Sequence, residues 1–482
     1  MRIPLKRLCS SPVVITAAAF VLRIAILYFE RHEFLGSSQS GEPYGFEAGE
    51  VARALVLGKG FSSPLPLVDT GPTAYLCPVY PFLLAGIFKF WGIYSLKSHV
   101  IAQTLNCALA ALTVLPVYAI AKRSFDRRTA LLSSWLWVIL PDAWHIPIAY
   151  VWDSTLSAFW FALIFWATLA LRDRSRLINW ATYGALWAIG GMINATILSV
   201  LPFFLGWLVW NARKESLRWL PRLGVTVLVF VVGVVPWSVR NYRVFHTFIP
   251  MRSNLGLMLW VGNNPIVVGI DSFAFTVFGD QREADAYQRI GEIPYMKLKQ
   301  KEALTYIWAH PAVTVRNVAR RIGSFWFEVS DRPHNILSDD PLYVKALLCW
   351  NALFVALCLL GAVTMRRSRN PAAPPYLFAL LVYPLTYYVT CSLVRYRFPM
   401  EFIVAILAAY GSEEVFGDWY CRLIGTNPTC FATPNAAQTR RSTIANTAVT
   451  NATSGIVIRP RFGLSRSLAT PRFDTLFERL LR

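Results

Sequence analysis

Charged residues are scarce in this sequence of 482 residues. Asp, Glu, Lys and Arg make up only 15% of it, whereas 55% of the residues are hydrophobic. A soluble globular protein carries about 25% charged residues and rarely contains long apolar runs. Trp and Tyr are abundant, at 18 and 20 copies, and both are enriched where membrane helices leave the bilayer. The composition therefore predicts an integral membrane protein that crosses the bilayer several times.

Familiar catalytic and metal-binding motifs are also missing. The chain contains no P-loop, no Gly-x-Ser-x-Gly and no His-Glu-x-x-His, and its six His are dispersed. The eight Cys form no Cys-x-x-Cys pair, which argues against a disulfide framework and a thiolate metal site. No cofactor is indicated. Four residues are available as ligands for a divalent metal, but no spacing supports such a site: Glu47, Glu50, His145 and Asp153.

Acidic residues are outnumbered by basic ones, 27 to 47, which gives a net charge of +20. A nucleic-acid-binding protein would gather such charge on one face. Here the basic residues form short runs between apolar stretches, at 122–128, 172–176, 213–222 and 366–369. This pattern is typical of cytoplasmic loops under the positive-inside rule, so we expect membrane lipids and no nucleic acid as partners.

Apolar stretches long enough to cross a bilayer follow one another along the chain. We expect about ten transmembrane helices, at 11–29, 98–121, 129–147, 153–171, 178–210 (two helices), 221–239, 343–365, 375–393 and 397–415. The first lacks a small-residue cleavage site and contains Arg23, so it is predicted to be a retained helix, not a signal peptide. The break within 178–210 is expected near Gly190, Gly191 and Asn194.

The basic loops also decide the topology. They all lie on the inside only if the N-terminus is cytoplasmic and segment 78–92 stays at the membrane interface instead of crossing. The first loop (30–97), the residues around Tyr150 to Asp153, the long loop 240–342 and the turn 395–397 then lie outside together.

The expected organisation is an all-α polytopic domain followed by a tail. The domain covers residues 1–415, with external juxtamembrane helices in loop 240–342, where apolar residues recur at helical spacing. Residues 416–482 are basic, rich in Thr, Asn and Ala, and are predicted to be a disordered cytoplasmic tail.

The stretch "YGFEAGEVARAL" (44–55) places two carboxylates one helical turn apart in the first external loop. Pairing on a solvated helix suits Glu50, which has Arg53 three residues further on. It suits Glu47 less well, because this residue follows Phe46. A carboxylate near an aromatic wall and a bilayer loses solvation, which raises its proton affinity towards the range useful for a general base. We therefore predict a catalytic role for Glu47.

Other charged residues occur at the outer ends of predicted helices. Asp153 in "YVWDS" either caps a helix or faces the same cavity as Glu47 and orients a substrate. Four Arg residues lie at helix ends: Arg240, Arg243, Arg395 and Arg397. Such residues anchor a protein at the interface or bind a phosphate through the planar guanidinium group.

Four segments between about 40 and 411 resemble a known family in sequence and order. They are "YGFEAGEVARALVLGKGFSSP", "TGPTAYLCPVYPFLLAGIFKFWG", "PWSVRNYRVFHTFIPMRSNLGLMLWVGNNP" and "RYRFPMEFIVAILAAYG". The family is the bacterial membrane glycosyltransferases of family 39 with their RgtA-to-D-like relatives. It lies in the GT-C superfamily, together with protein O-mannosyltransferases and lipid A aminoarabinose transferase. The third segment is the most distinctive.

The resemblance implies a GT-C-type helical bundle in the bacterial inner membrane, with its active site facing the periplasm. It implies a hexosyl or pentosyl transferase that takes a sugar from a polyprenyl-phosphate donor and passes it to a lipid, glycan or protein. Glu47 matches the acidic residue that deprotonates the acceptor, and Asp153 matches a second acidic position. The Arg residues near the last helices would hold the carrier phosphate. The family often has Asp, or an Asp-Glu pair, at the position of Glu47, so either Glu47 does this task alone or Glu50 shares it. Glu50 is expected to bind substrate.

Two other functions fit parts of the sequence. A transporter or flippase of lipid-linked sugars predicts charges near the bilayer midplane and an internal repeat, neither of which is seen. A polysaccharide polymerase or ligase would use the same donor, and only the family resemblance separates it from a single-sugar transferase.

Overall fold

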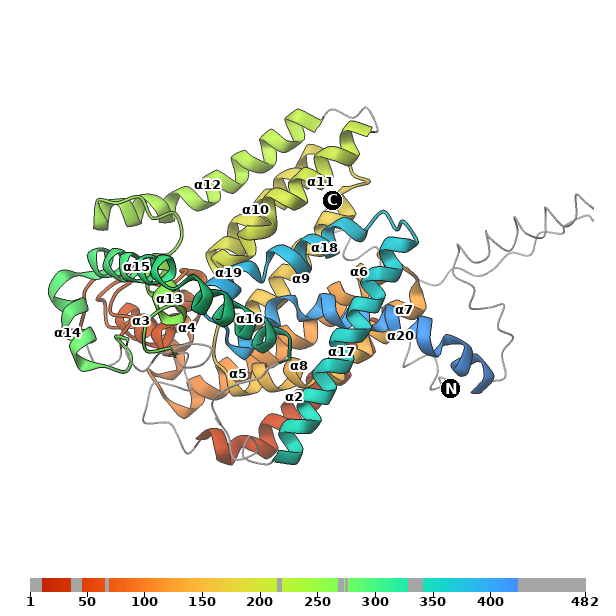
Figure 1. Cartoon of the computed structure of the whole chain (residues 1–482), viewed down its shortest axis with the longest axis horizontal. Coiled ribbons are helices and arrows are strands. Elements are labelled where there is room, and N and C mark those ends of the chain that lie inside the picture. The colour runs from red at the N-terminus through yellow and green to blue at the C-terminus, as the bar shows by residue number, and fades with distance from the viewer. Residues whose placement is uncertain are drawn as a thin grey trace, which may run out of the picture. The chain divides into compact units, whose positions relative to one another are not determined.

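The computed structural model describes residues 11–35, 46–65, 69–214, 219–267, 273, 276–327 and 341–423. Every regular element among them is a helix, and the one β-type pairing in this part of the chain is an isolated bridge between Ser62 and Pro72. The predicted all-α fold is confirmed. The chain divides into two units, Met1–Gly411 and Ser412–Arg482, and the account below concerns the first (Figure 1). Most of the predicted tail, from 424 onwards, lies outside the described residues.

Six stretches in the described part of the chain are long and apolar enough to span a membrane. They are Pro12–Phe29, Leu96–Ser124, Ser154–Leu171, Ala195–Arg213, Trp219–Phe245 and Lys345–Arg367. Each falls on an expected crossing, and together they support a polytopic membrane protein. The other expected crossings form shorter helices or helices interrupted by proline, except for 397–415, most of which belongs to one helix that begins at Glu401.

The interruptions have a local cause. Residues 129–147 divide into α7 (Arg127–Ile139) and α8 (Pro141–Ala149), and residues 375–393 divide into α18 (Ala373–Val382) and α19 (Leu385–Val389). A proline lies at each break, Pro141 and Pro384, because its ring fixes φ and it has no N–H to donate. Each piece is shorter than the roughly 20 residues that a simple crossing needs.

Two other expectations about helix ends can be compared with the structure. α10 (Leu177–Ile193) ends at Asn194, as predicted, and the side chain of Asn194 accepts a hydrogen bond of 3.0 Å from the backbone N–H of Thr196 at the start of the next turn. That turn is the 3₁₀ helix η2 (Ala195–Val200), followed by α11 (Leu201–Lys214). α4 (Val79–Trp91) has 13 residues, too few to cross, which agrees with an interfacial position.

The interior of the bundle is built around α9 (Ser154–Leu171), which contacts α5 (Leu96–Leu112), α6 (Val114–Ser124), α10 and η5 (Phe398–Met400). Phe161 and Phe165 on α9 both pack against Phe402 at the start of α20 (Glu401–Leu423). Packing of aromatic side chains from distant segments therefore stabilises the interior.

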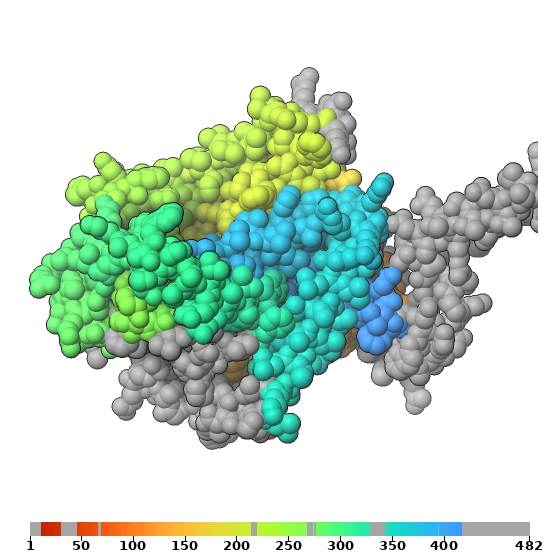
Figure 2. Space-filling view, in the orientation of Figure 1, coloured from red at the N-terminus to blue at the C-terminus, as the bar shows by residue number. Residues whose placement is uncertain are grey.

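The outer helices have a different surface. α12 (Trp219–Phe245) and α17 (Pro341–Arg367) expose several large apolar side chains. Figure 2 shows α17 crossing one face of the first unit. An exposed apolar helix surface of this length suits contact with lipid.

Helices from the segments predicted to be external gather at one end of the unit (Figure 1). They are α3 (Glu47–Val56), α4, α13 (Leu255–Gly262), α14 (Gln281–Ile290) and α15 (Glu292–Ala309). A further external helix, α16 (Pro311–Phe327), lies nearer the middle of the unit. The helices predicted within loop 240–342 are thus present.

A buried carboxylate connects these external segments. Glu292 accepts hydrogen bonds from the hydroxyls of Thr73 (2.5 Å), Ser253 (2.6 Å) and Tyr287 (2.9 Å), and from the backbone N–H of Ala74 (2.9 Å). A buried carboxylate is tolerated when its oxygens are supplied with donors in this way. The segment that follows α3 is therefore fixed to the start of α15.

A buried guanidinium connects the external helices to the bundle. Arg321 on α16 donates to the carbonyl oxygens of Gly262 (2.5 Å), Tyr388 (2.8 Å) and Thr390 (3.0 Å). Gly262 must be glycine for this contact, because a Cβ atom there would lie 1.5 Å from the Thr390 carbonyl oxygen. The end of α13, the middle of α16 and the end of α19 thus meet at one point.

We expect Gly262→Ala to destabilise the protein, because its methyl group would displace the Thr390 carbonyl and the Arg321 guanidinium. Overpacking of this kind costs about 1–3 kcal/mol. The matched control is Gly323→Ala on α16, where a Cβ would have no neighbour within 4 Å and helix propensity would improve. Thermal unfolding of the detergent-solubilised variants measures the difference. Equal melting temperatures for the two variants would contradict the described packing at Gly262.

Candidate active site

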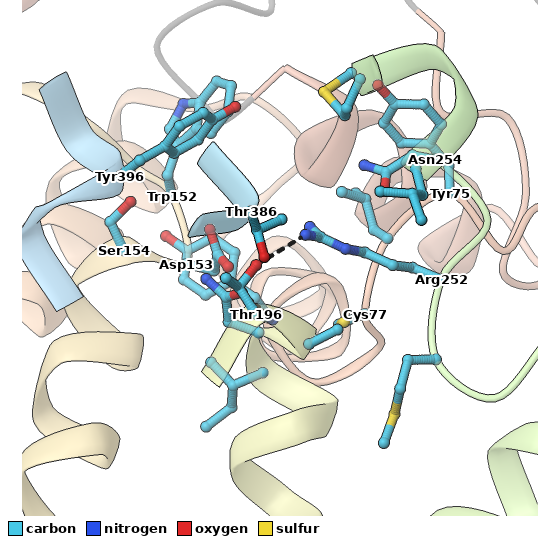
Figure 3. A pocket seen from close by; sticks show the side chains of 18 of the residues that line it. Tyr75, Cys77, Trp152, Asp153, Ser154, Thr196, Arg252, Asn254, Thr386 and Tyr396 are labelled. Atoms are coloured by element: carbon cyan, nitrogen blue, oxygen red, sulfur yellow. Dashed lines mark hydrogen bonds between the residues drawn. The ribbon is translucent and has the colours of Figure 1, made fainter. Parts of the chain in front are cut away.

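A cavity of about 590 Å³ opens between segments that are far apart in the sequence. Its lining residues come from 47–48, 75–81, 152–154, 193–199, 250–258, 273 and 386–399. All four segments that were predicted to lie outside together contribute to it. Figure 3 shows side chains from several of these segments pointing into one space.

Glu47 is the first residue of α3 and lines this cavity. It follows Phe46, whose backbone has a positive φ of 41° and whose ring packs edge-on against Phe278. Burial raises the pKa of the Glu47 carboxyl, and the positive charge of Arg395 offsets part of this increase. Among the described residues, Glu47 forms no ion pair within 4.0 Å. Its carboxylate is thus available to a molecule in the cavity.

Asp153 lines the same cavity from the N-cap position of α9. Its side chain forms no capping hydrogen bond, so helix capping does not account for this residue. Burial raises the pKa of Asp153, and Arg252 and Arg395 lower it again in part. The structure therefore brings Glu47 and Asp153 together at one cavity, which is one of the two alternatives considered for Asp153 from the sequence.

Arg395 is the one predicted Arg residue that lines the cavity. It belongs to the 3₁₀ turn η4 (Val394–Tyr396). The central carbon of its guanidinium group lies 3.2 Å from the ring centroid of Trp152 and 5.4 Å from that of Tyr396. Stacking on aromatic faces holds a guanidinium group in place while its N–H donors remain available.

Arg252 is a cavity residue that we did not predict from the sequence. It lies in the loop before α13 and extends into the cavity, where it donates a hydrogen bond of 3.2 Å to the hydroxyl of Thr196 (Figure 3). Its position within the most distinctive of the four family-like segments was the available signal. No helical or strand period marks which side chain of that loop points inwards.

The other predicted substrate-binding residues do not line the cavity. Glu50 accepts hydrogen bonds from Arg53 (2.7 Å) and from the hydroxyl of Tyr94 (2.7 Å), which is the pairing considered for it from the sequence. Arg243 is exposed on α12.

Arg240 and Arg397 have structural partners instead. Arg240 donates to the carbonyl oxygens of Thr73 (2.6 Å) and Phe61 (2.7 Å). Arg397 is buried and forms ion pairs with Glu401 (2.6 Å) and Asp142 (2.9 Å). These contacts favour a role in stability for both guanidinium groups.

The four residues considered as possible metal ligands are divided in the same way. Glu47 and Asp153 line the cavity, whereas Glu50 and His145 do not. In the described part of the chain, no group of three or more His, Cys, Asp and Glu side chains is arranged to hold a metal ion.

The arrangement combines two carboxylates with two guanidinium groups inside a cavity that has aromatic walls. The raised pKa of Glu47 is suited to accepting a proton from a bound hydroxyl group. Arg395 and Arg252 are suited to binding an anionic group through several N–H donors. A reaction that deprotonates one molecule and releases an anion from another could therefore take place here.

Comparisons with known proteins agree with this picture. Residues 73–237 match the family described as dolichyl-phosphate-mannose-protein mannosyltransferase. No curated protein matches the chain by sequence at a significant level.

Several solved structures are similar to the chain. Structures of the oligosaccharyltransferase from Archaeoglobus fulgidus are among them. The apo form has a TM-score of 0.51 and 14% identity over 86% of this chain and 51% of that one. The complex with Zn and sulfate has a TM-score of 0.50 and 12% identity over 88% and 52%. ArnT from Cupriavidus metallidurans bound to undecaprenyl phosphate has a TM-score of 0.31 and 14% identity over 83% and 79%. The chain spans about half the length of the archaeal protein. The family match over residues 73–237 agrees with the resemblance described from the sequence, and the two archaeal structures show that the chain shares their fold.

The structure assigns Arg397 to the core and Arg395 to the cavity. Substituting each residue in turn tests this assignment. Arg397→Met should strongly destabilise the protein, because it leaves the buried carboxylates of Asp142 and Glu401 without their guanidinium partner. Breaking a buried ion pair costs about 3–5 kcal/mol. The same change two residues earlier, Arg395→Met, should cost less than about 1 kcal/mol, since it removes a cation–π contact beside a cavity. Melting temperatures of the two variants measure the difference in stability. A larger loss of stability for Arg395→Met than for Arg397→Met would contradict the assignment.

Proposed function

We propose that this chain, whose fold is that of GT-C glycosyltransferases, transfers a sugar from a polyprenyl-phosphate carrier to a hydroxyl-bearing acceptor. The observation that carries the proposal is the position of Glu47 and Arg395 in one cavity. The carboxylate there has no ion-pair partner among the described residues, and the guanidinium group stacks on Trp152. The match of residues 73–237 to a family of dolichyl-phosphate-mannose transferases supports a lipid-phosphate donor.

The chemistry follows from these groups. Glu47 accepts the proton of the acceptor hydroxyl while the oxygen of that hydroxyl attacks the anomeric carbon of the donor. The bond between this carbon and the phosphate oxygen breaks, and polyprenyl phosphate leaves with the electron pair. The transition state has oxocarbenium character, as in other glycosyl transfer. Arg395 binds the phosphate and stabilises its growing negative charge. Asp153 binds and orients a substrate in the same cavity.

A lipid-linked donor also explains the position of the site in a membrane protein. The prenyl chain stays in the hydrocarbon region, while its headgroup reaches a cavity built from loops and helix ends. The positive-inside rule, applied to the basic loops, supports an outer position for these segments. We therefore propose that the protein acts in the bacterial inner membrane with its cavity facing the periplasm, and that its acceptor is a lipid, a glycan or a protein.

Glu47→Gln tests the proposed base. The amide has nearly the same shape but cannot take up the proton, and loss of a general base lowers the rate by about 10²–10⁴-fold. We expect the variant to keep its melting temperature and its affinity for polyprenyl phosphate. In cells that carry only this variant, analysis of lipid-linked sugars should show accumulated donor and unmodified acceptor.

The matched control is Glu50→Gln, one turn further along α3, which removes the partner of Arg53 outside the cavity. It should retain transfer. Normal turnover in Glu47→Gln, or equal losses in both variants, would remove Glu47 from the mechanism.

Arg395→Met tests the phosphate site. We expect its affinity for polyprenyl phosphate to fall about 10-fold or more, because hydrogen bonds to a charged group contribute about 1.5–3 kcal/mol. Binding can be measured by microscale thermophoresis in detergent. An unchanged affinity would leave Arg395 with an anchoring role only.

The pH dependence of the same variant gives a second measurement. Burial raises the pKa of Glu47 above its ordinary value of 4.5, and Arg395 lowers it in part. Transfer should be fully active above this pKa and decline as the pH falls through it. Without Arg395, the acidic limb of the single-turnover rate should move to higher pH. A limb that moves to lower pH would contradict the assigned neighbours.

A further inference from the structure

Two carboxylates and two guanidinium groups line the cavity: Glu47, Asp153, Arg252 and Arg395. Figure 3 shows Asp153 and Arg252 near Thr196 in the same part of the cavity. In agreement with this position, Arg252 lowers the pKa of Asp153. The proposed reaction uses Glu47 as the base and Arg395 to bind the phosphate, and it assigns no role to Arg252.

Uncharged polar groups lie beside Asp153 and Arg252 in the cavity. The hydroxyl of Thr196 accepts the hydrogen bond from Arg252 at 3.2 Å, and Thr386 lies close by (Figure 3).

We propose, on the premise of the transferase function, that the space between Asp153 and Arg252 holds the sugar ring of the donor and selects an uncharged sugar. The hydroxyl groups of a neutral sugar can donate to Asp153 and accept from Arg252, so both charged groups obtain hydrogen bonds.

Charged sugars are excluded by the same pair. An amino sugar carries an ammonium group that Arg252 repels, and a uronic acid carries a carboxylate that Asp153 repels. In either case one of the two protein charges faces a like charge in a desolvated space, which lowers the affinity. The opposite charges of Asp153 and Arg252 thus discriminate in both directions.

The experiment compares four lipids with the purified full-length protein. They are polyprenyl phosphate without a sugar and polyprenyl phosphates that carry mannose, 4-amino-4-deoxyarabinose or galacturonic acid. We expect the wild-type protein to bind the mannose lipid at least about 10-fold more tightly than either lipid with a charged sugar. Arg252→Met should reverse the preference in favour of the amino sugar, and Asp153→Asn in favour of the uronic acid.

Controls separate charge selection from general damage. Arg289→Met removes an exposed positive charge on α14 and should leave all four affinities unchanged. Melting temperatures establish that each variant is folded, and Arg252→Gln replaces the Met variant if the latter does not fold.

The outcomes distinguish this inference from the proposed function. If the wild-type protein does not bind the sugar-free lipid, the transferase proposal fails. If it binds that lipid but neither variant changes the ranking of the three sugars, the assignment of Asp153 and Arg252 is overturned while the transferase proposal stands.

Discussion

The buried guanidinium group of Arg397 is the constraint on which the geometry of the cavity depends. It forms ion pairs with Asp142 on α8 and Glu401 on α20, and donates to the carbonyl oxygen of Trp326 (2.6 Å) on α16. A charge in an apolar interior is tolerated only with such partners. Because Arg397 directly follows η4, these bonds also fix the turn from which Arg395 reaches the cavity.

The same principle recurs around the cavity. Arg321 collects carbonyl oxygens from the ends of two helices, and Glu292 collects donors from three segments. Each of these polar groups connects parts of the chain that helix packing alone would leave loosely related. The cavity residues therefore belong to segments whose positions are fixed by hydrogen-bonded buried groups. A site that keeps its geometry in the absence of a substrate needs such support.

The sequence predicted the helical class, a break near Asn194 and a shared outer side for the segments that carry Glu47, Asp153 and Arg395, because hydrophobic runs and basic loops determine which segments share a side. It could not separate Arg395 from Arg397. Arg395 lies in the 3₁₀ turn η4 and Arg397 lies between η4 and η5, where no regular period assigns side chains to a face. Only tertiary contacts decide which of the two enters the core. Arg252 was missed for a related reason, since its loop has no period. The expected crossings at 129–147 and 375–393 are each divided into two helices, at Pro141 and Pro384. The apolar length of a segment alone does not reveal such a break.

Asp153 stands at the head of α9 but does not cap it. The most central helix of the bundle is therefore independent of the carboxylate that faces the cavity, and so are the aromatic contacts of Phe161 and Phe165. Descendants of this chain could exchange the residue at this position, and with it the charge presented to a ligand, without weakening the scaffold. Such a separation would let an ancestral protein diversify its chemistry over generations while its architecture stayed the same.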